Sequence, residues 1–227
     1  MAKDVIIACD FSSKEETLEF LSKFGDRKPF VKIGMELFYA EGPEIVRTIK
    51  DMGHPIFLDL KLHDIPNTVG SAIKVLDRLG VDMCNVHVAG AGRMMKAAAD
   101  STKGLVIGVT QLTSTSQEVM ESEILIDRPL EDVVIEYARN AKASGLGGVV
   151  CSPLEAAAVH KACGDDFLTV TPGIRFAEDA VGDQVRVTTP EMARQIGSDY
   201  IVVGRSITKA ADPVAAYEKC RKEFLGL

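Results

Sequence analysis

The chain has 227 residues, of which 46% are hydrophobic and 26% are charged, and its formal net charge is −7. These values exclude a disordered chain, and the length fits one α/β domain spanning residues 1–227. No apolar run is long enough to cross a bilayer and the acidic balance argues against nucleic acid, so we expect neither a membrane nor a nucleic-acid partner.

Short apolar runs alternate with amphipathic stretches along the whole chain. The runs predict strands at residues 5–9, 30–33, 56–60, 83–88, 105–109, 148–151, 167–170 and 200–203. Apolar residues at helical spacing predict helices at 14–24, 43–52, 66–79, 91–100, 130–143, 153–162, 190–196 and 212–224, with a short helix near 118–124. Eight β–α units in about 230 residues are typical of a (β/α)8 TIM barrel.

A doubly wound sheet is the alternative architecture. Its nucleotide-binding form places a glycine-rich turn after the first strand, whereas this chain has Asp-Phe-Ser-Ser at 10–13. We therefore predict the barrel. The active site of such a barrel lies at the C-terminal ends of the strands, where this chain carries Asp10, Lys32, Asp59, Lys61, Thr113, Pro172, Gly204 and Arg205.

The five cysteines are odd in number and include no C-x-x-C pair. Cys9, Cys84 and Cys151 fall within apolar runs, where a thiol usually behaves as a small buried hydrophobe. The first residues lead directly into a strand without the pattern of a signal peptide. Together these features predict a protein of the reducing cytoplasm.

The segment that begins at Asp59 brings three charged groups to one strand end. It follows an apolar run at 56–58, and alternate side chains of a strand face the same way, so Asp59 and Lys61 are expected side by side. Asp64 comes three residues later, and Pro66 suits the first turn of a helix. Unpaired charge near a core is costly. A salt bridge that closes a loop and a catalytic site both remain open at this point.

The pattern Asp59-x-Lys61-x-x-Asp64, followed by Ile-Pro-Asn-Thr, resembles the signature of the orotidine 5'-monophosphate decarboxylase family. The resemblance extends to Asp10, to V-K-I-G at 31–34, T-P-G-I-R at 171–175, G-D-Q-V-R at 182–186 and V-G-R-S at 203–206. It implies a homodimeric TIM barrel that converts orotidine 5'-monophosphate to UMP in de novo pyrimidine biosynthesis. It also implies that the reaction needs no metal ion and no other cofactor.

The same resemblance implies a catalytic group of Lys32, Asp59, Lys61 and Asp64. Lys61 would offset the charge of a carbanion at C6 of the pyrimidine and then donate a proton to it. Asp59 would hold Lys61 in place. Asp64 would enter the site from the partner subunit, together with Thr68.

The family further implies substrate contacts around the barrel mouth. Asp10, Lys32 and Thr68 would contact ribose hydroxyls. The remaining contacts would be Thr113 at the pyrimidine edge, Pro172 in the wall of the base pocket, and Gln184, Gly204 and Arg205 at the phosphate. The neighbouring hydroxyls of Thr110, Ser114 and Thr115 leave open which of them reads the pyrimidine. Gln184 belongs to a segment at 176–189 that has the length of a lid.

Two other functions remain open. A Mg-dependent decarboxylase or aldolase acting on a sugar phosphate shares the D-x-K-x-x-D pattern, but that group typically has a metal-binding glutamate where this chain has Lys32. Glu36 lies four residues further on. A non-catalytic nucleotide-binding barrel is the second alternative, and the intact charge array argues against it. The histidines lack the spacing of metal ligands on one element, and we expect His54 and His160 at the surface.

Overall fold

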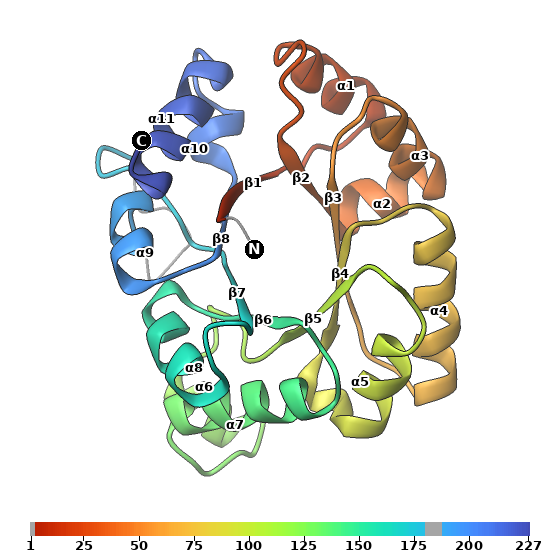
Figure 1. Cartoon of the computed structure of the whole chain (residues 1–227), viewed down its shortest axis with the longest axis vertical. Helices are drawn as coiled ribbons and strands as arrows, with labels where there is room; N and C mark the ends of the chain where they lie inside the picture. The colour runs from red at the N-terminus through yellow and green to blue at the C-terminus, as the bar shows by residue number, and fades with distance from the viewer. Residues whose placement is uncertain (1–2, 180–187) are drawn as a thin grey trace.

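Within residues 3–179 and 188–227, the part of the chain that the computed structural model describes, eight parallel strands close into a barrel (Figure 1). Each strand pairs with the next along the sequence, and β8 returns to pair with β1. This confirms the predicted (β/α)8 TIM barrel. The strands are β1 (Asp4–Ala8), β2 (Phe30–Gly34), β3 (Ile56–Leu62), β4 (Met83–His87), β5 (Leu105–Val109), β6 (Gly148–Val150), β7 (Leu168–Thr171) and β8 (Tyr200–Val203).

Helices surround the barrel on its outer side (Figure 1). The predicted helical stretches are confirmed to within about two residues at each end. Two helices were not predicted, α2 and α10, because α2 buries only Leu37 and α10 has four residues, so neither repeats an apolar spacing. The helices are α1 (Lys14–Ser22), α2 (Met35–Glu41), α3 (Pro43–Asp51), α4 (Pro66–Arg78), α5 (Ala91–Ala99), α6 (Gln117–Ser122), α7 (Leu130–Ala143), α8 (Ala156–Cys163), α9 (Pro190–Ile196), α10 (Arg205–Thr208) and α11 (Pro213–Leu225), with the short 3-10 helices η1 (Val88–Gly90) and η2 (Pro153–Glu155).

Both faces of the barrel strands are buried, which is why the strands stand in the sequence as continuous apolar runs. In β2, Phe30 belongs to the cluster that fills the barrel, whereas Val31 and Ile33 pack toward the helices. Lys32 therefore shares the inward face with Phe30, as the alternation of strand side chains requires. The inner cluster consists of Ile6, Ala8, Phe30, Phe57, Met83, Ile107, Val170 and Val202.

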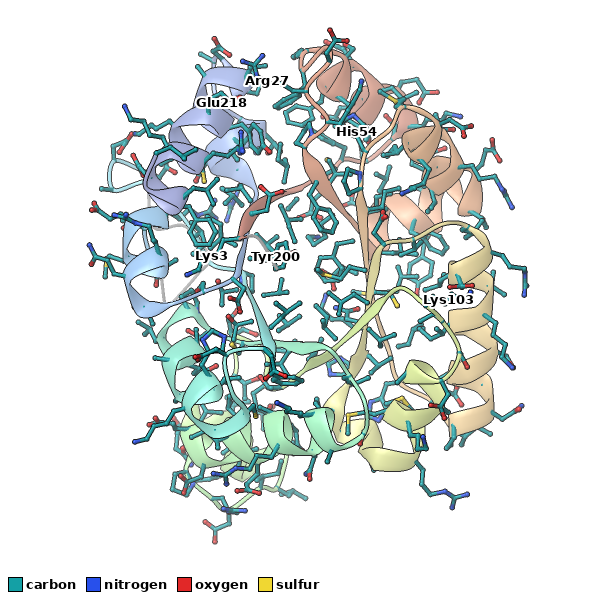
Figure 2. The ribbon with its side chains drawn as sticks, viewed as in Figure 1. Lys3, Arg27, His54, Lys103, Tyr200 and Glu218 are labelled. Carbon is teal, nitrogen blue, oxygen red and sulfur yellow. The ribbon has the colours of Figure 1, made fainter. Side chains whose placement is uncertain are left out.

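Two histidines that were expected at the surface lie inside contacts between elements. His54 is 1% exposed, and its Nδ1 lies 2.9 Å from the carbonyl oxygen of Pro29, so the ring links the entrances of β3 and β2 (Figure 2). Burial lowers the pKa of His54. His160 on α8 lies 2.9 Å from Asp199 and is largely covered. The surface prediction was wrong for both because their partners are distant in sequence.

All five cysteines are buried free thiols, as expected for Cys9, Cys84 and Cys151. Burial raises the pKa of Cys9 and of Cys84 to about 12, so both thiols stay protonated at neutral pH. In the described ranges, no helix is both long and apolar enough to cross a membrane.

Gly148 on β6 provides a test of the barrel packing. A Cβ added there would lie 2.4 Å from the carbonyl oxygen of Leu168 on the neighbouring strand, and backbone cannot move aside without disturbing the ladder. We expect Gly148→Ala to lower the free energy of unfolding by about 1–3 kcal/mol, measured by urea unfolding. Gly92→Ala on α5 is the control, because the nearest atom is a hydroxyl on a rotatable side chain. An equal loss in both variants would contradict the packing argument.

Candidate active site

Charged side chains from three neighbouring strands meet at the C-terminal mouth of the barrel. Asp10 follows β1, Lys32 lies on β2, and Asp59 and Lys61 lie near the end of β3. The Nζ of Lys32 lies 2.7 Å from Oδ1 of Asp10 and 3.5 Å from Oδ2 of Asp59. The Nζ of Lys61 lies 2.7 Å from Oδ1 of Asp59. The four groups therefore form a chain of alternating charge, in the order Asp10, Lys32, Asp59, Lys61.

Burial and charge compete at the centre of this chain. The side chains of Lys32 and Asp59 are only 11% and 13% exposed. Burial would raise the pKa of Asp59, but Lys32 and Lys61 outweigh it and hold that pKa below its usual value. Burial would lower the pKa of Lys32, but Asp10 and Asp59 hold it above its usual value. Both groups are therefore ionised at neutral pH, and the charge of each favours the ionised form of the other.

The backbone of Lys61 departs from an ordinary strand. Lys61 has a φ of 52°, in the left-handed region that non-glycine residues rarely adopt. The pairing of β3 with β4 shifts register between Leu58 and Leu62. Asp59 and Lys61 thus lie side by side as predicted, but the simple alternation on which the prediction rested does not continue through Lys61.

Asn85 on β4 is a residue of this site that the sequence reasoning missed. Its Oδ1 accepts a hydrogen bond from the Lys61 backbone N–H at 2.8 Å, and its Nδ2 donates to Oδ1 of Asp59 at 2.7 Å. The side chain is buried. A polar residue within an apolar strand run was the available signal, because a buried polar group needs a partner.

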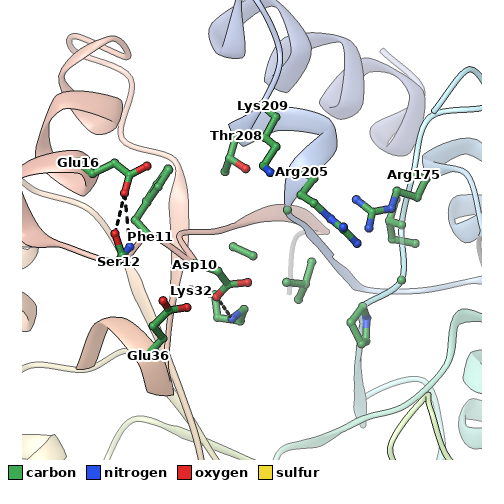
Figure 3. Close-up of a pocket in the computed structure, with 16 residues that line it drawn as sticks. Asp10, Phe11, Ser12, Glu16, Lys32, Glu36, Arg175, Arg205, Thr208 and Lys209 are labelled. Carbon is green, nitrogen blue, oxygen red and sulfur yellow. Dashed lines mark hydrogen bonds and ion pairs between the residues drawn. The ribbon is translucent and has the colours of Figure 1, made fainter. Parts of the chain in front are cut away.

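A cavity of about 590 Å³ opens beside the charge chain toward β7 and β8 (Figure 3). Asp10, Lys32, Pro172 and Gly204 line it. The guanidinium groups of Arg175 and Arg205 also face this cavity, across from Asp10 and Lys32 (Figure 3). Burial lowers the pKa of Arg175, and the positive charge of the neighbouring Arg205 lowers it further. Two cationic side chains thus lie at this cavity, beyond the ends of β7 and β8, and the place of Arg175 there was not predicted.

A smaller cavity of about 220 Å³ holds the other end of the charge chain. Asp59 and Lys61 line it, and it shares Lys32, Pro172 and Val202 with the larger cavity, so the two adjoin. The segment after β5 contributes one amide, two hydroxyls and one apolar side chain to its lining: Gln111, Thr113, Ser114 and Leu112. The remaining lining residues are apolar side chains of the strands: Phe57, Val109 and Val150.

The hydroxyls after β5 differ in their direction. Thr113 and Ser114 line the smaller cavity. Thr110 is buried and donates its hydroxyl to the carbonyl oxygen of Val150 at 3.0 Å, and Thr115 is also buried. Among the four hydroxyls that the sequence left open, Thr113 and Ser114 are therefore the two that face a ligand-sized space.

Two predicted site residues stay outside both cavities within one chain. Asp64 is exposed and accepts a hydrogen bond from the N–H of Ile65, and Thr68 is exposed in the first turns of α4. Neither residue lines the larger cavity or the smaller cavity that holds Asp59 and Lys61. Gln184, the predicted phosphate contact, lies outside the described residues.

A protein-family model described as the orotidine 5'-phosphate decarboxylase / HUMPS family matches residues 3–220. The chain belongs to this family. It is 54% identical over 236 aligned residues to a Bacillus cytotoxicus protein named orotidine 5'-phosphate decarboxylase, with 100% of this chain and 99% of the relative covered. A Geobacillus thermodenitrificans protein of the same name is 54% identical over 230 residues, with 97% and 96% covered.

Solved structures support the same assignment. The crystal structure of orotidine 5'-phosphate decarboxylase from Lactobacillus acidophilus has a TM-score of 0.89 to this chain at 45% identity, covering 98% of this chain and 99% of that one. An uncharacterized conserved protein from Geobacillus kaustophilus has a TM-score of 0.87 at 48% identity, covering 97% of this chain and 99% of that one.

In residues 3–179 and 188–227, no three His, Cys, Asp or Glu side chains are grouped so as to hold a metal ion.

The ionisation of Asp59 gives a pH-dependent test of the charge chain. Because the folded-state pKa of Asp59 lies below its usual value of 3.8, the ionised group contributes to stability above that value, and the contribution is lost as the pH falls through the lowered folded pKa. We expect Asp59→Asn to reduce the free energy of unfolding more at pH 7 than near pH 3, by urea unfolding at one protein concentration. Asp165→Asn, which removes an exposed carboxylate, is the control. A pH-independent difference between wild type and Asp59→Asn would contradict the prediction.

Proposed function

We propose that this chain decarboxylates orotidine 5'-monophosphate to UMP, a step of pyrimidine biosynthesis, and that residues 1–227 act as one decarboxylase domain. The observation that carries the proposal is the Lys32–Asp59–Lys61 group, with Lys32 and Asp59 largely buried, beside a cavity that ends at two arginines. This arrangement suits a substrate with a reacting centre at one end and a phosphate at the other. Full-length identity of 54% to named orotidine 5'-phosphate decarboxylases supports the same substrate.

The reaction breaks the bond between C6 of the pyrimidine and the carboxylate carbon. The electron pair of that bond stays on C6, and CO2 departs. The ammonium of Lys61 offsets the negative charge that develops at C6 and then gives its proton to that carbon. Asp59 holds the ammonium 2.7 Å away and keeps Lys61 aimed at the smaller cavity. Fixed charge thus does the work that an electron-accepting cofactor would otherwise do, so we propose that the reaction needs none.

The two adjoining cavities divide the substrate between them. The pyrimidine would occupy the smaller cavity, against Pro172 and within reach of the Thr113 or Ser114 hydroxyl. The ribose would lie where the cavities meet, beside Asp10 and Lys32. The phosphate would bind at the backbone of Gly204 and the guanidinium groups of Arg175 and Arg205, joined by Gln184. A phosphate held far from the reacting carbon contributes binding energy that can be used in the transition state.

A homodimer would complete the site. Asp64 and Thr68 are exposed near the mouth and stay outside both cavities of their own chain. A two-fold axis beside the start of α4 would bring these residues to the mouth of the partner. Asp64 would then extend the charge chain beyond Lys61, and Thr68 would reach a ribose hydroxyl.

The Mg-dependent reaction of the same barrel group fits this site less well. A divalent cation in the mouth would use Asp10 and Asp59 as ligands. The ammonium of Lys32 already lies between these carboxylates, 2.7 Å from one and 3.5 Å from the other. Lys32 therefore supplies the positive charge that a metal ion would bring.

The free cysteines further support a reducing compartment, and we propose the cytoplasm.

A decarboxylation assay on the purified protein tests the proposed function. We expect orotidine 5'-monophosphate to be converted to UMP in excess EDTA, followed by the change in pyrimidine absorbance. Lys61→Ala should lower kcat by at least about 10²–10⁴, the range for a positioned acid. Lys103→Ala, an exposed lysine on the outer surface (Figure 2), should leave kcat unchanged. Activity that disappeared with EDTA and returned with Mg²⁺ would favour the metal-dependent alternative, and full activity of Lys61→Ala would contradict its role.

The shared site is tested by mixing two inactive variants. Lys61→Ala and Asp64→Ala are dissociated together and allowed to reassociate. A mixed dimer has one site that lacks both groups and one that has both, so equal mixing should restore about a quarter of wild-type activity. Each variant carried through the same treatment alone is the control. If both residues served one chain's own site, every site would lack one group, and dimers shown to have exchanged subunits would stay inactive.

A further inference from the structure

The carboxamide of Asn85 lies between the two groups on which the reaction depends. It is 1% exposed, on the inward face of β4, and it contacts β3 at both of its polar atoms. The residues on either side, Cys84 and Val86, pack toward the helices. A buried amide needs a hydrogen-bond partner at each of its polar atoms, and Lys61 and Asp59 supply one partner each to Oδ1 and Nδ2 of Asn85.

The first contact supports an unusual backbone. A left-handed conformation is unfavourable for a non-glycine residue, because its Cβ crowds the following carbonyl oxygen, and it persists only where the surroundings hold it. Lys61 adopts it with a φ of 52° inside the register shift, where β3 advances from Leu58 to Leu62 while β4 advances from Cys84 to Val86. At this point the Lys61 N–H donates to Oδ1 of Asn85, at 2.8 Å, in place of a strand carbonyl.

The second contact orients the carboxylate. Oδ1 of Asp59 accepts one hydrogen bond from Nδ2 of Asn85 and another from Nζ of Lys61, both at 2.7 Å. Two donors on one oxygen fix the rotation of the carboxylate and turn its Oδ2 toward Lys32, 3.5 Å away. One amide therefore sets both the backbone from which Lys61 projects and the anion to which its ammonium is bound.

We propose that Asn85 is a positioning residue of the decarboxylation, which aims the Lys61 ammonium by holding its left-handed backbone and the Asp59 carboxylate together. The inference rests on the proposed function for its kinetic consequence, but its geometric consequence stands apart from it. Without Asn85 the Lys61 backbone can relax toward an ordinary strand conformation, and its ammonium then leaves the line toward the reacting carbon. Displacement by about 1 Å can cost about 10²-fold in rate.

Two variants and one control test the proposal. Asn85→Leu keeps the number and branching of the side-chain heavy atoms, in a larger volume, but removes both hydrogen bonds. Asn85→Asp keeps the acceptor for the Lys61 N–H and replaces the donor by a second carboxylate. Thr169→Val, a buried strand residue bonded to Asp199 at the opposite end of the barrel, is the control for loss of a buried polar contact. Each is compared with wild type for kcat, KM, the pH profile of kcat/KM and thermal unfolding.

We expect Asn85→Leu to lower kcat about 10²-fold with little change in KM, because the phosphate and ribose contacts remain. In both Asn85 variants the acid limb of kcat/KM should move to higher pH, since losing the Asn85 hydrogen bond removes one cause of the lowered Asp59 pKa. Thr169→Val should lose stability without either kinetic change. Wild-type kcat in a folded Asn85→Leu protein, or an unchanged acid limb in both variants, would overturn the proposal.

A crystal structure of an Asn85 variant separates this proposal from the proposed function. We expect Lys61 in Asn85→Leu to leave the left-handed region and its Nζ to move away from Oδ1 of Asp59. If Asn85→Leu does not fold, Asn85→Asp decides, through the position of Asp59 and the acid limb. A wild-type protein that fails to decarboxylate orotidine 5'-monophosphate would remove the proposed function alone, whereas an unmoved Lys61 in the variant would remove the role of Asn85 alone.

Discussion

The structure of the site depends on one buried anion. Asp59 lies at the inner end of the mouth with its side chain 13% exposed, where an isolated carboxylate would be strongly destabilised. Ammonium groups on either side, from Lys32 and Lys61, and one amide donor, from Asn85, compensate for the burial. Because each of these groups is held by Asp59 in turn, the charge chain is a single unit in which no member can be moved alone.

The barrel makes this unit possible by bringing side chains distant in sequence to adjacent positions. Parallel strands end at one rim, so Asp10, Lys32 and Asp59, from the first three βα units, meet within ion-pair distance. The same rim continues to β7 and β8, where Arg175 and Arg205 face the larger cavity. Burial of Lys32 and Asp59 limits access of water to their charges, which strengthens their interaction.

Much of this arrangement could be predicted from local pattern. Burial of both strand faces produces continuous apolar runs, so the strands followed from the sequence. The direction of Lys32 toward the barrel mouth was expected from the resemblance and not from this pattern. The helices followed wherever an apolar face repeats over three turns. α2 and α10 were missed because a short helix with one or two buried residues has no period to detect. The resemblance added the predicted catalytic role of Lys61 and the predicted phosphate contacts, which pattern alone does not assign.

The sequence by itself determined the barrel, the strand ends and the identity of the charged groups that stand at them, because these depend on burial and spacing along one segment. Only the tertiary structure decided how the groups meet. The left-handed Lys61, the bridge through Asn85 and the pairing of Arg175 with Arg205 at one cavity depend on the register between strands and on loops that converge from distant parts of the chain. The tertiary structure also leaves Asp64 and Thr68 exposed and outside both cavities. Local periodicity specifies which side chains share a strand face, but it does not show where a register shift interrupts the pairing, since strands pair through backbone groups that every residue shares.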